Sequence, residues 1–184
     1  SVHSMNVFVG TYNVCARAPQ GLDMRSWLCP STYHQAPADI VAIVLEELVP
    51  LNAQQLLQSA KEELESWKLA VSRTLESTGV QYELLRHELL FGTALLVLVK
   101  SDVLPHVKNV EGTTKKTGFR GMSGNKGGVA VRLDLFDTSV CFVGSHLPSG
   151  ASNYEDRNAD YAAFERNLVF MRCRTIESHD HIIW

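Results

Sequence analysis

The glycine-rich segment 118–131 carries two side chains that suit phosphate, Asn125 and Lys126. Its five glycines permit backbone conformations that other residues avoid, and they let amide groups approach an anion closely. Lys126 adds a positive charge, and Asn125 adds a neutral hydrogen-bond donor. His146 closes the next apolar run along the chain. This combination predicts a phosphate-binding loop, and the alternative is a flexible glycine turn between two strands.

The residue order in this segment excludes a nucleotide-binding P-loop. That motif needs Gly-Lys followed by Ser or Thr, and it leads into a helix. In this chain Asn125 precedes Lys126 and Gly127 follows it, while the apolar alternation over residues 129–135 predicts a strand. We therefore exclude a P-loop NTPase.

Side chains with oxygen ligands follow two further apolar runs. Asn13 ends the first run, where its amide can bind a hard cation, orient a phosphate oxygen or form a turn. Glu46 and Glu47 close the second run, and strict alternation would send only one of them toward the site. Mg²⁺ takes few oxygen ligands from protein and bridges to substrate phosphates. One carboxylate and one amide therefore predict a magnesium site, with solvated surface carboxylates as the alternative.

Hydrophobic periodicity predicts the elements that must position these residues. Apolar residues that step by three and four predict a helix over 52–77 and a second helix over 154–171. The second helix would bury Tyr161, Phe164, Leu168 and Met171. Short apolar runs predict strands at 6–14, 39–45, 80–87, 89–100, 103–111, 128–136 and 139–146. We expect two packed sheets with helices outside them.

Length and composition indicate that residues 1–184 form one soluble globular unit or a large piece of one, with a sizeable core, and we expect them to be the N-terminal part of a single domain. The chain is 45% hydrophobic and 20% charged, and it has no repeat or linker. It lacks an initiator methionine and stops on an apolar segment, so we interpret both ends as cuts in a longer chain. Its four cysteines show no CxxC spacing, which argues against a zinc site or a disulfide framework and favours a reducing compartment. No apolar run approaches the roughly twenty residues of a membrane span, and no signal peptide opens the chain.

The charge balance argues against a protein that binds nucleic acid non-specifically. The formal net charge is -3 and the isoelectric point is about 6.1, whereas such a protein needs an excess of basic side chains on one face. Local positive charge is expected at Lys115, Lys116, Arg120, Lys126 and Arg132.

Several segments together resemble the inositol polyphosphate 5-phosphatases, in particular the synaptojanin-type branch. The resemblance runs from about residue 7 to residue 184 and keeps the order and spacing of the motifs. It rests on TYN at 11–13, PADIVAIVLEELVPLNA at 37–53, NVEGTTKKTGFRGMSGNKGGVAVR at 109–132, CFVGSHLPSG at 141–150 and EDRNADY at 155–161. It implies a four-layer α/β/β/α sandwich of the magnesium-dependent endonuclease/phosphatase superfamily, incomplete at the C-terminus.

The resemblance also implies roles for individual residues. Glu47 matches the family's metal-binding glutamate, and Asn13 matches its strand-end asparagine near the metal. Asn125 and Lys126 match the phosphate side of the site, and His146 matches the histidine that contacts the scissile phosphate. The implied catalytic group is therefore His146, Asn125 and Asn13, with Mg²⁺ held by Glu47.

Other positions match the family less directly. Asp156, Arg157 and Asn158 match a polar cluster that packs behind the site. His179 and Asp180 resemble a His-Asp pair that precedes the family's next strand, where capping that strand is an equal alternative to a part in catalysis. Two departures are that Glu46 stands where the family usually has Gln, and that Pro148 and Ser149 replace alanines.

The implied activity is magnesium-dependent hydrolysis of the 5-phosphate of phosphoinositides or soluble inositol polyphosphates. Such a substrate implies a cytoplasmic protein in peripheral contact with membranes, and no nucleic-acid partner is expected. The family's later motifs, which supply the water-activating acid, do not occur in residues 1–184. Two alternatives stay open: a catalytically inactive fragment or binding module, and a related metal-dependent nuclease.

Overall fold

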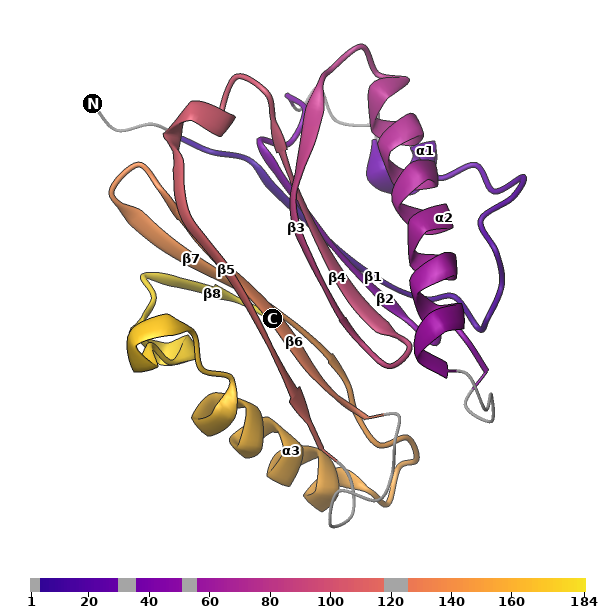
Figure 1. Ribbon diagram of the computed structural model, residues 1–184, viewed down its shortest axis with the longest axis vertical. Helices are drawn as coiled ribbons and strands as arrows, with labels where there is room; N and C mark the ends of the chain where they lie inside the picture. The colour runs from indigo at the N-terminus through magenta and orange to yellow at the C-terminus, as the bar shows by residue number, and fades with distance from the viewer. Residues whose placement is uncertain (1–3, 30–35, 51–55, 118–125) are drawn as a thin grey trace.

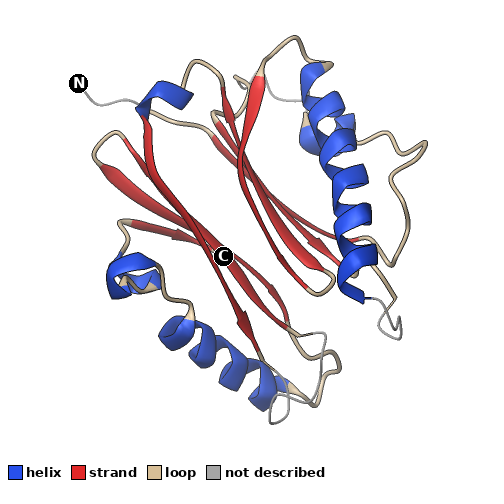
Figure 2. Cartoon of the chain, in the orientation of Figure 1, coloured by secondary structure: helices blue, strands red, loops and turns tan. Residues whose placement is uncertain are grey.

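Two four-stranded sheets face each other, and helices cover their outer faces (Figure 1; Figure 2). The computed structural model describes residues 4–29, 36–50, 56–117 and 126–184. The layers run in the order helix, sheet, sheet, helix, which confirms the predicted α/β/β/α sandwich (Figure 2).

The first sheet has the strand order β1-β2-β4-β3. β1 runs parallel to β2, and the other two pairs are antiparallel. The outer face of this sheet is covered by α1 and α2 (Figure 1). The bounds are β1 Val7–Asn13, α1 Arg25–Leu28, β2 Ile40–Glu46, α2 Leu56–Glu76, β3 Tyr82–Leu90 and β4 Thr93–Lys100.

The second sheet has the strand order β5-β6-β7-β8. Its first three strands form antiparallel pairs, and β8 adds in parallel to β7. α3 and two short 3₁₀ turns cover its outer face (Figure 1). The bounds are β5 Val107–Lys116, β6 Gly127–Leu135, β7 Thr138–His146, α3 Tyr154–Asn167 and β8 His181–Ile183, with 3₁₀ turns at Leu104–His106, Met171–Cys173 and Ile176–Ser178.

Strand alternation divides the apolar residues among three packed regions. Ile43 on β2 faces the helical layer and packs with Trp67 of α2, whereas Val44 faces the second sheet. The two sheets approach closely at Gly144, because a Cβ there would lie 2.7 Å from Cγ2 of Val44. Burying both faces of β2 explains its unbroken apolar sequence.

The predicted elements are largely confirmed, with differences at their ends. The helix predicted over 52–77 spans Leu56–Glu76 in the described residues, and positions 52–55 lie outside them. The helix predicted over 154–171 ends at Asn167, because Leu168 takes an extended conformation. Phe164 and Leu168 are buried as predicted, but Tyr161 and Met171 are 46% and 72% exposed.

Two predicted strands begin and end differently. The strand predicted over 103–111 starts with the 3₁₀ turn Leu104–His106, where Pro105 occupies the first turn, and then continues to Lys116. The strands predicted at 80–87 and 89–100 meet in a hairpin that turns at Phe91, whose φ is +55°. The short elements α1 and β8 were not among the predicted ranges.

Candidate functional site

The two sheets bring the predicted side chains of Glu47, Lys126 and His146 together at one end of the sandwich. Parallel pairing of β1 and β2 sets Asn13 opposite Glu46, so both strands end at the same edge. In the second sheet the first residue of β6, Gly127, pairs with His146 at the end of β7. The carboxylate of Glu47, just beyond β2, lies near the end of β7, with Oε1 3.7 Å from Nε2 of His146.

Lys126 and His146 form the closest polar contact among the described residues of this site. The Lys126 Nζ lies 2.8 Å from His146 Nε2. Burial lowers the pKa of the His146 imidazole, and the Lys126 charge lowers it further while Glu47 opposes the shift. A neutral imidazole accepts at Nε2 from the Lys126 ammonium, which leaves its proton on Nδ1.

Glu47 lies just beyond β2 and has a left-handed backbone, with φ of +55°. This conformation is costly for a residue with a Cβ, and such strain concentrates at functional sites. Its Oε1 is too far from His146 for a hydrogen bond, and its Oε2 faces the thiol of Cys15 at 3.8 Å. Within the described residues, the carboxylate therefore has only these two long contacts, which leave acceptor positions for a cation.

The charges of both acidic side chains act on the Lys126 ammonium. Burial lowers the pKa of Lys126, and the charges of Glu47 and Glu46 oppose that shift. Burial also raises the pKa of Glu46, against the effect of the Lys126 charge. Strict alternation does not apply to Glu47, because its backbone leaves the extended conformation on which alternation depends. Which of the two carboxylates faces the site stays a prediction.

Asn13 lies at the strand edge and also forms a turn. Its Oδ1 accepts the backbone N–H of Cys15 at 3.0 Å, which is an Asx turn. An amide oxygen has a second lone pair, so the turn leaves room for one further contact. Asn125, the other predicted catalytic amide, lies outside the described residues.

The residues predicted behind the site fall into two groups. Arg157 on α3 donates from NH1 to the carbonyls of Pro148 and Gly150, at 3.1 and 2.6 Å, and so holds the chain that follows His146. Asp156 and Asn158 are exposed on the same helix.

Asp180 is not brought to the site. Its Oδ2 accepts both the N–H and the Oγ–H of Ser139, at 2.8 and 2.7 Å. Ser139 lies seven residues before His146 on β7, a separation of about 23 Å at the rise of a strand. Asp180 therefore anchors the start of β8 at the far end of the sheet.

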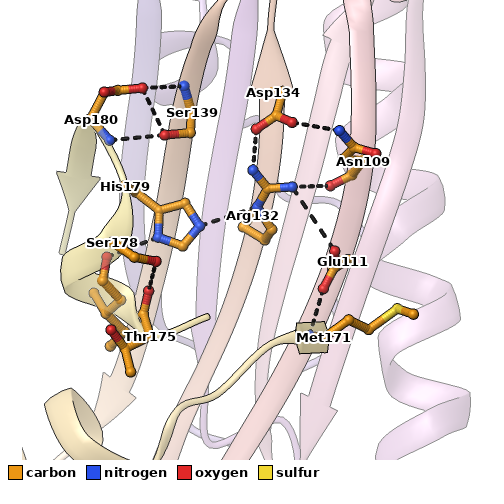
Figure 3. Close-up of polar contacts among 11 residues, drawn as sticks. Asn109, Glu111, Arg132, Asp134, Ser139, Met171, Thr175, Ser178, His179 and Asp180 are labelled. Carbon is orange, nitrogen blue, oxygen red and sulfur yellow. Dashed lines mark hydrogen bonds and ion pairs between the residues drawn. The ribbon is translucent and has the colours of Figure 1, made fainter. Parts of the chain in front are cut away.

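A second polar cluster surrounds Arg132 and includes His179 from the segment that precedes β8 (Figure 3). The Arg132 Nε–H donates to His179 Nε2 at 3.1 Å, and NH1 donates to the carbonyl of Asn109 at 2.7 Å. Its remaining nitrogen, NH2, pairs with Asp134. His179 Nδ1 donates in turn to the carbonyl of Ile176 at 2.8 Å. Arg132 is fully buried, so the expectation that it supplies available positive charge is wrong.

Thr117 and Asp160 were missed in the sequence analysis, although both are linked to the glycine-rich segment. The backbone N–H of Thr117 donates to the carbonyl of Lys126, and the hydroxyl of Thr117 donates to the carboxylate of Asp160. The spacing of Asp160 from Arg157 and Phe164 on the predicted helix was the available signal, because residues three and four apart share a helix face.

The oxygen groups at the strand edge suit a hard cation such as Mg²⁺. The described part of the chain has no cluster of three or more His, Cys, Asp or Glu side chains that could hold a metal. Mg²⁺ needs no such cluster, because it binds through one or two carboxylates and completes its coordination with water and substrate. Glu47 provides a carboxylate whose described contacts are long, and Asn13 provides an amide oxygen with a second lone pair, so the residues present fit this ion.

Known proteins resemble this chain in sequence over nearly its whole length. Inositol-1,4,5-trisphosphate 5-phosphatase 1 of Schizosaccharomyces pombe is 39% identical over 186 residues, which cover 98% of this chain and 17% of the relative. Polyphosphatidylinositol phosphatase INP53 of Saccharomyces cerevisiae is 40% identical over 184 residues, covering 100% of this chain and 16% of the relative. The chain thus spans about a sixth of the length of these relatives.

Solved structures share the fold. The inositol polyphosphate 5-phosphatase domain of spsynaptojanin, in complex with inositol (1,4)-bisphosphate and a calcium ion, matches with a TM-score of 0.85 and 36% identity. This match covers 97% of the chain and 50% of that domain. Cimex nitrophorin, at a TM-score of 0.53 and 14% identity over 81% of this chain and 50% of its own, shows the fold alone.

The family model described as Endonuclease/Exonuclease/phosphatase family 2 matches residues 10–184. The matches to inositol 5-phosphatases confirm the resemblance that the motifs indicated. The chain belongs to the endonuclease/exonuclease/phosphatase family 2, within which it is similar to synaptojanin-type inositol 5-phosphatases.

Proposed function

We propose that this chain forms part of a magnesium-dependent phosphatase that removes the 5-phosphate from phosphoinositides such as phosphatidylinositol 4,5-bisphosphate. The observation that carries the proposal is the convergence of Glu47, Lys126 and His146 from two sheets, with Lys126 Nζ 2.8 Å from His146 Nε2. A cation, a neutral imidazole and a carboxylate within a few ångströms suit a phosphoryl group shared with a metal ion.

Each side chain of the site would have a role in binding that follows from its charge. Lys126 would bind a phosphoryl oxygen and neutralise charge that accumulates there, and His146 would orient a second oxygen from its ring. Glu47, with Asn13 beside it, would hold Mg²⁺, which when bound polarises the phosphate and stabilises the leaving oxygen. The resemblance assigns activation of the attacking water to later motifs of the family.

We also infer that the protein acts at membrane surfaces on the cytoplasmic side. The proposed substrate carries its phosphates in a lipid headgroup, and a relative is named a polyphosphatidylinositol phosphatase. Among the described residues, none of the helices combines the length and the apolar character that crossing a membrane requires. Peripheral contact therefore suits the proposed substrate.

A phosphate-release assay tests the proposal. The complete gene product that contains residues 1–184, and residues 1–184 alone, are incubated with Mg²⁺ and one of three substrates: phosphatidylinositol 4,5-bisphosphate vesicles, soluble inositol 1,4,5-trisphosphate or plasmid DNA. We expect the complete product to release the 5-phosphate. Nicking of DNA without phosphate release would favour a nuclease, and no turnover of any substrate would favour an inactive binding module.

The Glu47→Gln variant of the complete product tests the site. Loss of the carboxylate should lower turnover about 10²–10³-fold, the range seen when one preorganised polar group is removed. It should also remove the rise in melting temperature that Mg²⁺ produces in the wild type, because a ligand that binds only the folded state stabilises it. Turnover like that of the wild type would mean that the site is misplaced.

A further inference from the structure

We propose that Asp160 is a positioning residue, which fixes the closing end of the glycine-rich segment through the hydroxyl of Thr117. The inference rests on the proposed function, because it assigns a task to the loop that presents Lys126. It concerns a residue that contacts neither the imidazole nor the carboxylate of the site.

The backbone pair Thr117–Lys126, here called the loop neck, closes the segment between β5 and β6. The N–H of Thr117 donates to the carbonyl of Lys126 at 3.1 Å. It continues the antiparallel ladder one step beyond the pair Lys116 and Gly127. The position of the Lys126 backbone therefore depends on Thr117.

The side chain of Thr117 is tied to the outer helix layer. Its Oγ1–H donates to Oδ2 of Asp160 on α3 at 2.8 Å. Thr117 is only 9% exposed, and Asp160 is partly buried. A hydroxyl–carboxylate bond of this kind is charge-assisted and shielded from water, so it is stronger than a neutral surface bond.

One face of α3 holds both segments that reach the site. Arg157, Asp160 and Phe164 are spaced by three and four residues and share this face. Arg157 binds the chain after His146, and Asp160 binds the loop neck. Phe164 packs on Gly128, where a Cβ would lie 2.9 Å from Cδ1 of the ring.

This arrangement fixes the backbone from which the flexible Lys126 side chain extends. Lys126 has a long unbranched stem, and its ammonium lies 2.8 Å from His146 Nε2. In the proposed function this ammonium would have to stay within reach of the phosphate. When the loop neck loses the hydrogen bond from Thr117 to Asp160, only a fraction of the molecules hold Lys126 beside His146. The apparent affinity for substrate then falls by the same fraction.

Steady-state kinetics on the complete gene product test the inference with matched pairs. Thr117→Val removes the hydroxyl at constant shape, and Thr117→Ser keeps it. Asp160→Ala removes the acceptor, and Asp160→Asn keeps one acceptor oxygen. Glu155→Ala, on an exposed position of α3, controls for changes in the helix.

We expect Thr117→Val and Asp160→Ala each to raise KM for soluble inositol 1,4,5-trisphosphate about tenfold, with kcat changed less. Thr117→Ser and Asp160→Asn should stay near the wild type, and the double variant should be no worse than either single one. Unchanged KM in both removal variants, or additive losses in the double variant, would overturn the inference.

Hydrogen exchange separates this inference from the proposed function. The backbone amide of residue 117 should exchange faster in Thr117→Val than in Thr117→Ser, and faster in Asp160→Ala than in Asp160→Asn. The reason is that its hydrogen bond to the Lys126 carbonyl opens more often. If the wild type hydrolyses no inositol phosphate, the proposed function fails and the exchange result alone decides. Equal exchange in all variants would overturn the role of Asp160.

Discussion

Two histidines, His146 at the end of β7 and His179 just before β8, each contact a cation, and their surroundings differ. His146 contacts Lys126 at the strand end where the two sheets meet, with the Glu47 carboxylate 3.7 Å away and not bonded to it. His179 accepts from Arg132 at 3.1 Å toward the opposite end, and its other ring nitrogen also has a partner (Figure 3).

The difference lies in how fully each cation is satisfied. The Arg132 guanidinium donates to a ring nitrogen, a backbone carbonyl and a carboxylate, and it is fully buried. Lys126 has one described side-chain partner, and burial lowers its pKa despite two nearby carboxylates. A saturated cluster stabilises the fold, whereas an unsaturated one can exchange its contacts for a ligand.

Removing the saturated cation should give the largest effect. Arg132→Met keeps much of the volume but leaves Asp134 and Glu111 without their cation. We expect the free energy of unfolding to fall by about 3–5 kcal/mol, as when one partner of a buried ion pair is lost. Urea denaturation measures this change. Arg25→Met, which breaks an exposed pair with Asp23, is the control and should leave the midpoint unchanged.

Removing the Lys126 ammonium should lower turnover strongly and change stability little, the opposite of what we expect for Arg132. Lys126→Met should lower kcat/KM for the 5-phosphate about 10²-fold, because the variant lacks the charge that stabilises the transition state. Its unfolding midpoint should change far less than that of Arg132→Met, since a desolvated ammonium is removed with it. A large loss of stability with normal turnover would show that Lys126 stabilises the fold and does not act in turnover.

The smallest expected effect is a change in pH dependence at His179. Burial lowers the pKa of His179 and the Arg132 charge adds to that shift, while the bond to Ile176 and the charge of Asp134 oppose it. The unfolded chain therefore takes up the proton first, and stability falls as the pH drops below the ordinary histidine value of 6.5.

His179→Gln keeps an acceptor for Arg132 but cannot titrate. Urea midpoints measured between pH 5 and pH 7 should fall less steeply for this variant than for the wild type. Some slope should remain, because burial also lowers the pKa values of His87 and His146. Equal slopes in the two proteins would show that His179 does not contribute.

Local patterns predicted most of the fold and part of the site. The stripe through Trp67 and the buried run of β2 define α2 and the central strand, because each buries a face with a fixed period. Glu47, Lys126 and His146 were predicted to share a site, and the structure places them together. Their catalytic roles stay predictions.

What the sequence did not predict depends on contacts between distant segments or on unusual backbone conformations. The left-handed φ of Glu47 overrides strand alternation, and no residue type announces it. The sequence around Arg132 gives no sign that this basic side chain is buried. It is buried, and one of its partners is His179, which lies 47 residues later in the chain. The bond between Thr117 and Asp160 likewise joins residues that are 43 positions apart.

The most direct test of the central claim is a crystal structure of the complete gene product with Mg²⁺ and a soluble inositol phosphate. We predict one phosphoryl group in contact with Lys126 Nζ and the His146 ring, and the ion bound to the Glu47 carboxylate. A phosphate bound elsewhere, with the Lys126–His146 contact intact and no ion at Glu47, would contradict the account.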